Sequence, residues 1–85
     1  KYNTMQVTVI EFYNKLDKKQ QKVFRQNVLN LSDIDYNKFF YRLKHNSWTT
    51  LELAVINRII AGTGYVVAKE AYDMYEKIKP IQLQG

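Results

Sequence analysis

Residues 34–45 combine side chains that could contact a nucleic acid with the spacing of an amphipathic helix. At 100° per residue, one side of such a helix carries Asn37, Lys38, Tyr41, Arg42 and His45, with Lys44 adding a further charge. The other side carries Tyr36, Phe39, Phe40 and Leu43. Asparagine can pair with an adenine edge, lysine or arginine with guanine or phosphate, and tyrosine with phosphate or a thymine methyl. The pattern predicts a helix that meets DNA, although the solvated face of an ordinary core helix has the same pattern.

A second basic group precedes this segment, on an expected helix over residues 18–29. Its exposed side carries Lys18, Lys19, Lys22 and Arg25, which could hold backbone phosphates or form a solvated basic face. Residues 1–30 hold six basic and two acidic groups (+4), residues 31–48 three and two (+1), and residues 49–85 four and four (0), within a net charge of +5. This distribution indicates that one end meets a polyanion and the other meets protein. The alternative is that the charge only aids solubility.

The residue types that most enzymes and metal sites use are scarce. The chain has no cysteine and one histidine, His45, so no Cys-His pair and no His-rich metal site can be built. Asp33 and Asp35 lie where a helix is expected to begin, and capping explains them. The segment Gly62-Thr63-Gly64 is too short for a phosphate loop. We therefore expect no enzymatic activity, no cofactor, no metal and no small-molecule ligand.

Helical periodicity predicts the elements that must position these side chains. The expected fold is all-α, a compact bundle of about five helices in a single domain over residues 1–85. The helices are expected over residues 4–16, 18–29, 36–45, 50–60 and 63–79, with a tail over 80–85, and with Asp17, Asp35, Thr49 and Thr63 as N-caps and Asn30 and Pro80 as stops. Met5, Val7 and Val9 also alternate as in a strand, but we favour helix there.

The clearest helix boundary in the sequence is at residues 48–53. Thr49 and Glu52 have the spacing of a capping box, and Trp48 and Leu53 that of a hydrophobic staple. The apolar residues that follow predict that the fourth helix is the central buried one.

The segment from Lys18 to Lys44 resembles the helix-turn-helix of bacterial and phage transcription regulators. The resemblance is to the form whose recognition helix reads Ile/Val-Ser-x-x-Thr-Phe/Leu-Tyr-Arg-x-Phe/Leu, with matching positions at Ile34, Asp35, Lys38, Phe39, Phe40 and Leu43. Tyr41 replaces the Arg, and Arg42 supplies a neighbouring charge. Leu29 and Asp33 stand where the family has a small residue and a glycine. The resemblance implies sequence-specific binding of double-stranded DNA, with residues 36–45 in the major groove.

The expected helix over residues 63–79 carries more apolar surface than one core contact needs. Two adjacent stripes comprise Tyr65, Ala68, Tyr72 and Tyr75, and Val67, Ala71, Met74 and Ile78. We expect this helix to join two copies in a homodimer. The alternative is that it packs on both the first and the fourth helices.

These observations predict a small sequence-specific DNA-binding regulator of transcription in a bacterial, phage or mobile-element system. The alternative is a protein-protein interaction module in which the helix-turn-helix is structural only. Because the chain lacks cysteine, and because its longest apolar run, residues 53–56, is too short to cross a bilayer, we expect a cytoplasmic protein that does not enter membranes.

Overall fold

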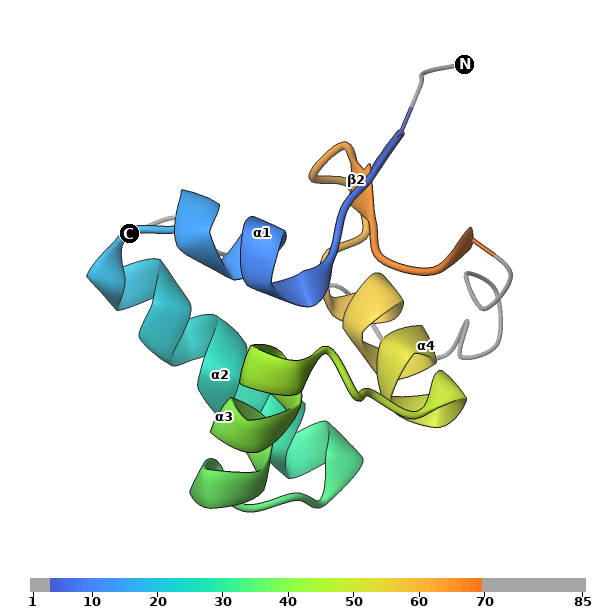
Figure 1. Cartoon of the computed structure of the whole chain (residues 1–85). Coiled ribbons are helices and arrows are strands. Elements are labelled where there is room, and N and C mark those ends of the chain that lie inside the picture. Colours follow the sequence, from blue (N-terminus) through green and yellow to red (C-terminus); the bar gives the residue numbers. More distant parts are fainter. Residues whose placement is uncertain (1–3, 70–85) are drawn as a thin grey trace.

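The described part of the chain, residues 4–69 of a computed structural model, is mostly helical. The elements in order are β1 (Met5–Gln6), α1 (Val9–Lys15), α2 (Lys18–Ser32), α3 (Tyr36–His45), α4 (Thr50–Ile59) and β2 (Tyr65–Val66). The strands pair in parallel, with Met5 opposite Tyr65 and Gln6 opposite Val66. Figure 1 shows this sheet at one end of the molecule, above α1 and α4. The expectation of an all-α fold is therefore correct for the helices of the middle segment and wrong for the two ends of the described range.

Helix α1 begins later than predicted, because residues 4–8 are extended. The backbone N–H groups of Met5 and Val7 donate to the carbonyls of Gly64 and Val66 at 2.9 and 3.0 Å. The helix is then started by Thr8 and Glu11, which form a capping box with bonds of 2.8 and 3.2 Å. The strand-like alternation at residues 5–9 was thus the correct signal, but its pairing partner lies about 60 residues away, where local periodicity carries no information.

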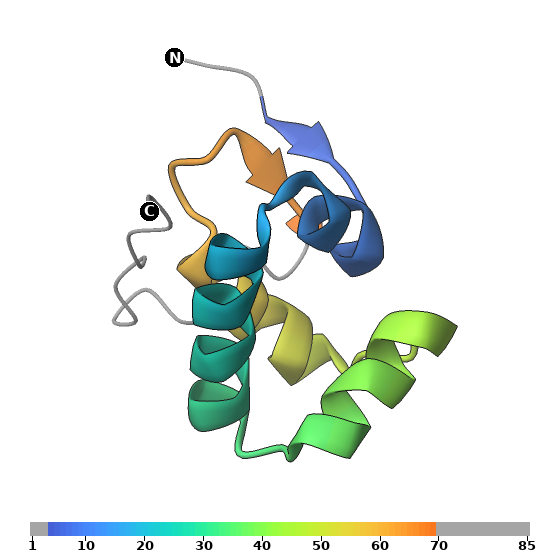
Figure 2. The same cartoon turned by 90° about the vertical axis from the view of Figure 1, so that its left-hand side faces the viewer.

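Short polar caps define the limits of α2 and α3. Asp17 and Asp35 accept hydrogen bonds from backbone N–H groups three residues on, which confirms both predicted N-caps. Asn30 does not end α2; the helix continues to Ser32, because Asp33 takes the left-handed conformation at φ 55°. The turn over residues 33–35 then redirects the chain, and Figure 2 shows α2 and α3 diverging from it.

Helix α4 is the central helix, as predicted. Its capping box is present, with Thr49 and Glu52 joined by reciprocal bonds of 2.9 and 3.1 Å. It buries most of its circumference and packs against α2, while α1 packs against α3. The main core cluster comprises Val9, Phe12, Tyr13, Phe24, Val28, Phe39, Leu43, Trp48, Val55, Ile56, Ile59, Ile60 and Val67.

Residues 63–68 do not form the start of a fifth helix. Gly62 and Gly64 both adopt φ +90°, and the Thr63 hydroxyl donates back to the Ile60 carbonyl at 2.6 Å, so Thr63 closes α4 instead of capping a new helix. The buried Asn57 side chain then holds the following segment extended: its amide nitrogen donates to the Ala68 carbonyl at 2.6 Å, and its oxygen accepts the Val67 N–H at 2.7 Å. The remainder of the expected helix, residues 70–79, and the expected tail over 80–85 lie outside the described residues.

No helix within residues 4–69 has the length and apolar character needed to cross a membrane.

Candidate nucleic-acid interface

Helix α3 is anchored to the core along one side only. Phe39 and Leu43 are its buried residues. The Phe39 ring lies 5.7 Å from that of Tyr13 on α1 and 5.6 Å from that of Trp48, in edge-to-face arrangements. Because the inner side is held by aromatic contacts with two other segments, the opposite side of α3 must face solvent.

The solvent side of α3 brings together most of the residues predicted to contact DNA. Its exposed members are Asn37, Lys38, Tyr41, Lys44 and His45, which we call the outer face of α3. Asn37, Tyr41 and Lys44 follow the i, i+4, i+7 spacing of a single stripe. The Tyr41 side chain is 60% exposed, and its ring lies 4.4 Å from that of His45. The outer face therefore offers an amide, two ammonium groups and a pair of aromatic rings along one side of a ten-residue helix.

Arg42 is turned away from the outer face, contrary to the prediction. Its Nε lies 2.9 Å from Oε1 of Glu52, and its Nη1 donates to the Ser47 carbonyl at 2.9 Å. Only 20% of the Arg42 side chain is exposed. The reason is tertiary: α4 places a buried carboxylate beside the last turn of α3, and an arginine within reach pairs with it.

Arg25 is also engaged within the protein. Its Nη1 donates to the Tyr13 hydroxyl at 2.9 Å, and its guanidinium lies over the rings of Tyr36 and Phe40, at 5.4 and 5.9 Å from their centres. Arg25 thus joins α1, α2 and α3. Its position at the edge of α3 still leaves a positive charge close to the exposed Tyr36 ring.

The three remaining basic residues of the predicted clamp are exposed on α2. Lys22 and Lys18 lie one and two helical turns before Arg25 on the same side of the helix, so they extend a basic stripe from Arg25 along α2. Lys19 is exposed on a neighbouring side. Lys22 and Lys18 therefore share the side of α2 that carries Arg25, whereas Lys19 lies on another side.

Two carboxylates lie at the N-terminal end of α3. Asp35 is the N-cap, with its Oδ1 accepting the Lys38 N–H at 2.7 Å, and Asp33 is the exposed residue that ends α2. Both would repel phosphates close to the turn. Phosphate contacts should therefore come from the middle and last turns of α3 and from the stripe on α2.

Sequence reasoning missed three partners that shape this region. Tyr13 binds Arg25 and Glu52 binds Arg42, the two arginines that were expected to be exposed. The Trp48 ring packs against the ring of Phe39. The only local signal was the cap position of Glu52, which predicts its bond to Thr49 but not its ion pair with α3.

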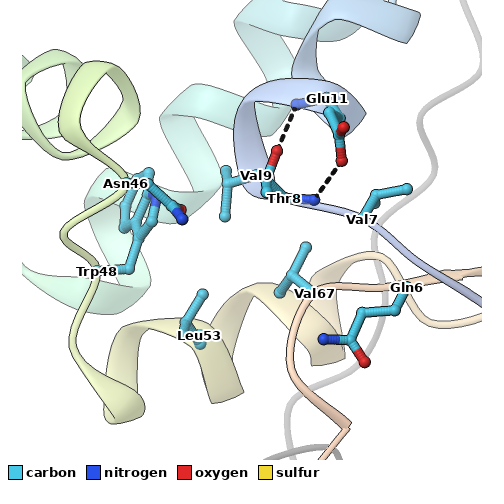
Figure 3. Close-up of a pocket in the computed structure, with 9 residues that line it drawn as sticks. All are labelled: Gln6, Val7, Thr8, Val9, Glu11, Asn46, Trp48, Leu53 and Val67. Carbon is cyan, nitrogen blue, oxygen red and sulfur yellow. Dashed lines mark hydrogen bonds between the residues drawn. The ribbon is translucent and has the colours of Figure 1, made fainter.

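A hollow of about 330 Å³ lies on another side of the molecule, between the start of α1, the 46–48 loop, α4 and the segment after β2 (Figure 3). It is lined by Gln6, Val7, Thr8, Val9, Glu11, Asn46, Trp48, Leu53 and Val67. The Glu11 carboxylate is occupied by the Thr8 backbone, and the Trp48 indole nitrogen is buried from solvent. The exposed Gln6 and Asn46 side chains also line the hollow, so its walls are polar as well as apolar.

Within residues 4–69, no cluster of three or more histidine, cysteine or acidic side chains is arranged to hold a metal ion. No protein-family model, no curated protein and no solved structure matches the chain.

Proposed function

We propose that this protein is a small sequence-specific DNA-binding regulator of transcription, in which α2 and α3 act as a helix-turn-helix. The observation that carries the proposal is the outer face of α3, where Asn37, Lys38, Tyr41, Lys44 and His45 are exposed opposite a buried aromatic anchor. A helix of about this length fits the major groove of B-form DNA. The bacterial, phage or mobile-element setting and the cytoplasmic location belong to the same proposal.

The proposed contacts divide into base reading and phosphate binding. Asn37 and Tyr41 lie on the central stripe of the outer face, where an amide can pair with adenine and a phenol ring can meet a thymine methyl. Lys44 lies on that stripe and Lys38 lies beside it, and both can reach guanine or phosphate. Lys22 and Lys18 continue the positive charge along α2, where they would bind the flanking backbone.

The predicted homodimer is part of this proposal. A two-fold pair would place two α3 helices on successive half-sites of a palindromic operator. Residues 63–68 do not form the expected dimer helix, and Val67 and Ala68 are buried in the protein's own core. The rest of the expected dimer helix, residues 70–79, lies outside the described residues.

The second candidate is a protein-protein interaction module. Exposed apolar side chains favour it, because Tyr36, Leu31 and Leu51 are each about half exposed outside the outer face of α3. Binding to a protein through such groups would depend weakly on salt, whereas DNA binding through phosphates weakens steeply as salt rises.

The decisive test is binding to DNA duplexes selected from a random pool, measured by gel shift at two salt concentrations. We expect Lys38→Ala to weaken binding by about 1–3 kcal/mol if Lys38 contacts a base, or to lower the salt dependence by about one counterion if it contacts phosphate. Lys69→Ala is the matched control, since Lys69 is an exposed lysine beyond β2 and away from α3. Equal losses in both variants, or no salt-sensitive binding by the parent, would favour the interaction module.

A further inference from the structure

The last turn of α3 is fastened to α4 through a single arginine. Arg42 Nε lies 2.9 Å from Glu52 Oε1, while Arg42 Nη1 donates to the Ser47 carbonyl at 2.9 Å. The backbone completes the attachment, because the Asn46 and Ser47 N–H groups both donate to the Arg42 carbonyl. The side chain and main chain of one residue thus hold the end of α3, the following loop and the start of α4 together.

Glu52 is the fixed partner in this arrangement. It is only 8% exposed, and its Oε1 also accepts the Thr49 N–H at 2.9 Å as part of the α4 capping box. A carboxylate buried to this degree needs a paired cation and hydrogen-bond donors. Arg42 provides the cation at ion-pair distance, and the Thr49 N–H provides a hydrogen bond. The planar guanidinium also reaches the Ser47 carbonyl with Nη1, and a lysine ammonium cannot contact both groups with the same geometry.

The position of Arg42 on the helix gives this attachment its effect. Phe39 and Leu43 fix how deeply α3 sits in the core, and the contacts of Arg25 with Tyr36 and Phe40 hold one flank of the helix. Arg42 lies on the other flank, between the core side and the outer face. A bond from the flank to α4, the most buried helix, fixes the direction in which Asn37, Lys38 and Tyr41 point.

We infer that Arg42 and Glu52 form a positioning pair that orients the outer face of α3 for DNA, and that Arg42 is not itself a DNA contact. The inference rests on the proposed function, because it assigns the pair a role in binding and not only in folding. It predicts that breaking the pair misdirects the contact residues and weakens specific binding, even where the net charge becomes more favourable for DNA.

Two substitutions test the pair, and each separates positioning from direct contact. Glu52→Gln keeps the cap, since glutamine serves at that position, but removes the charge that holds Arg42. It raises the net charge from +5 to +6, so an electrostatic effect alone would strengthen binding. Arg42→Lys keeps the charge and removes the two-acceptor geometry, so lysine would rescue a phosphate contact but not a positioning role.

The matched control is Glu11→Gln. Glu11 occupies the same capping-box position on α1, with its Oε1 accepting the Thr8 N–H, and it is exposed without an ion pair to an arginine in the described part of the chain. The Glu11→Gln variant has the same change in net charge and the same substitution in a capping box as Glu52→Gln, but it leaves α3 attached to α4.

Gel shifts on the selected duplex, well below the melting temperature of every variant, give the result. We expect Glu52→Gln and Arg42→Lys each to weaken binding about tenfold with unchanged salt dependence, while Glu11→Gln binds as the parent does or more tightly. Amide exchange should show faster exchange of the Asn46 and Ser47 N–H groups in the two α3–α4 variants alone.

Four results would overturn the inference. Glu52→Gln that binds as tightly as Glu11→Gln, or Arg42→Lys that binds like the parent, would show that orientation does not depend on the pair. Lower melting temperatures with unchanged affinity would make the pair structural only. If the parent itself binds no duplex, the proposed function fails and the positioning role with it, and amide exchange then reports only whether the attachment forms.

Discussion

Helices α3 and α4 have the same length and follow one another along the chain, yet the protein uses them in opposite ways. Each has ten residues, but α3 buries only Phe39 and Leu43, whereas α4 buries Glu52, Ala54, Val55, Ile56, Asn57 and Ile59. A helix that is buried nearly all round acts as scaffold, and one that is buried on one side leaves its other side exposed. The comparison indicates that substitutions on α4 should change stability, and those on the outer face of α3 should change binding.

The largest expected effect is on α4, at Ile56, which is 0% exposed. We expect Ile56→Ala to lower the free energy of unfolding by about 2–5 kcal/mol, because it opens a cavity in the centre of the core. Tyr41→Ala on the outer face of α3 should change it by less than about 0.5 kcal/mol. Urea denaturation measures both, and similar losses would contradict the division between the two helices.

The next effect concerns the contact of α4 with the segment after β2. Asn57→Ala leaves the Val67 N–H and the Ala68 carbonyl without their side-chain partners. We expect a loss of about 2–4 kcal/mol in the free energy of unfolding, since each buried unsatisfied group costs about 1–3 kcal/mol. Asn27→Ala is the control, because within residues 4–69 the Asn27 amide bonds to a carbonyl of its own helix and to no other element. The Val67 amide should exchange faster in Asn57→Ala than in the parent; unchanged exchange would argue against the clamp.

Arg25 tests how α3 is supported from α2. Replacing it with alanine removes the hydrogen bond to Tyr13 and the stacking on Tyr36 and Phe40. We expect a loss of about 1–2 kcal/mol in the free energy of unfolding from these two contributions. Lys22→Ala, one turn earlier on the same stripe, should leave stability within about 0.5 kcal/mol of the parent. Thermal melts that rank the two variants equally would mean that Arg25 behaves as a free surface cation.

The smallest effect is at the cap of α4. Thr49→Ala removes the hydroxyl that accepts the Glu52 N–H and should cost about 1 kcal/mol in the free energy of unfolding. Thr50→Ala, at the exposed first residue of the helix, is the control and should be nearly neutral. A larger loss at Thr50 than at Thr49 would place the start of α4 elsewhere.

Local signals in the sequence determined most of the helical part of this fold. Asp17, Asp35 and Thr49 each accept from a backbone N–H three residues away, so the cap and its effect lie within one helical turn and can be read directly from the chain. The same holds for the two-sided character of α3 and the apolar run of α4, because helical periodicity relates residues three and four apart. The list of exposed residues on the outer face of α3 was therefore predictable, with Arg42 as the exception.

Only the tertiary structure decided the features that join residues far apart in sequence. The pairing of β1 with β2, the bond of Asn57 to Ala68, the hydrogen bond of Arg25 to Tyr13 and the ion pair of Arg42 with Glu52 each join separate elements. No repeating pattern in the sequence predicts these contacts, because each of them depends on how the elements pack together. For that reason the sequence identified α3 as a helix with one exposed side, whereas packing decided which of its charged side chains face solvent and which bind other parts of the protein.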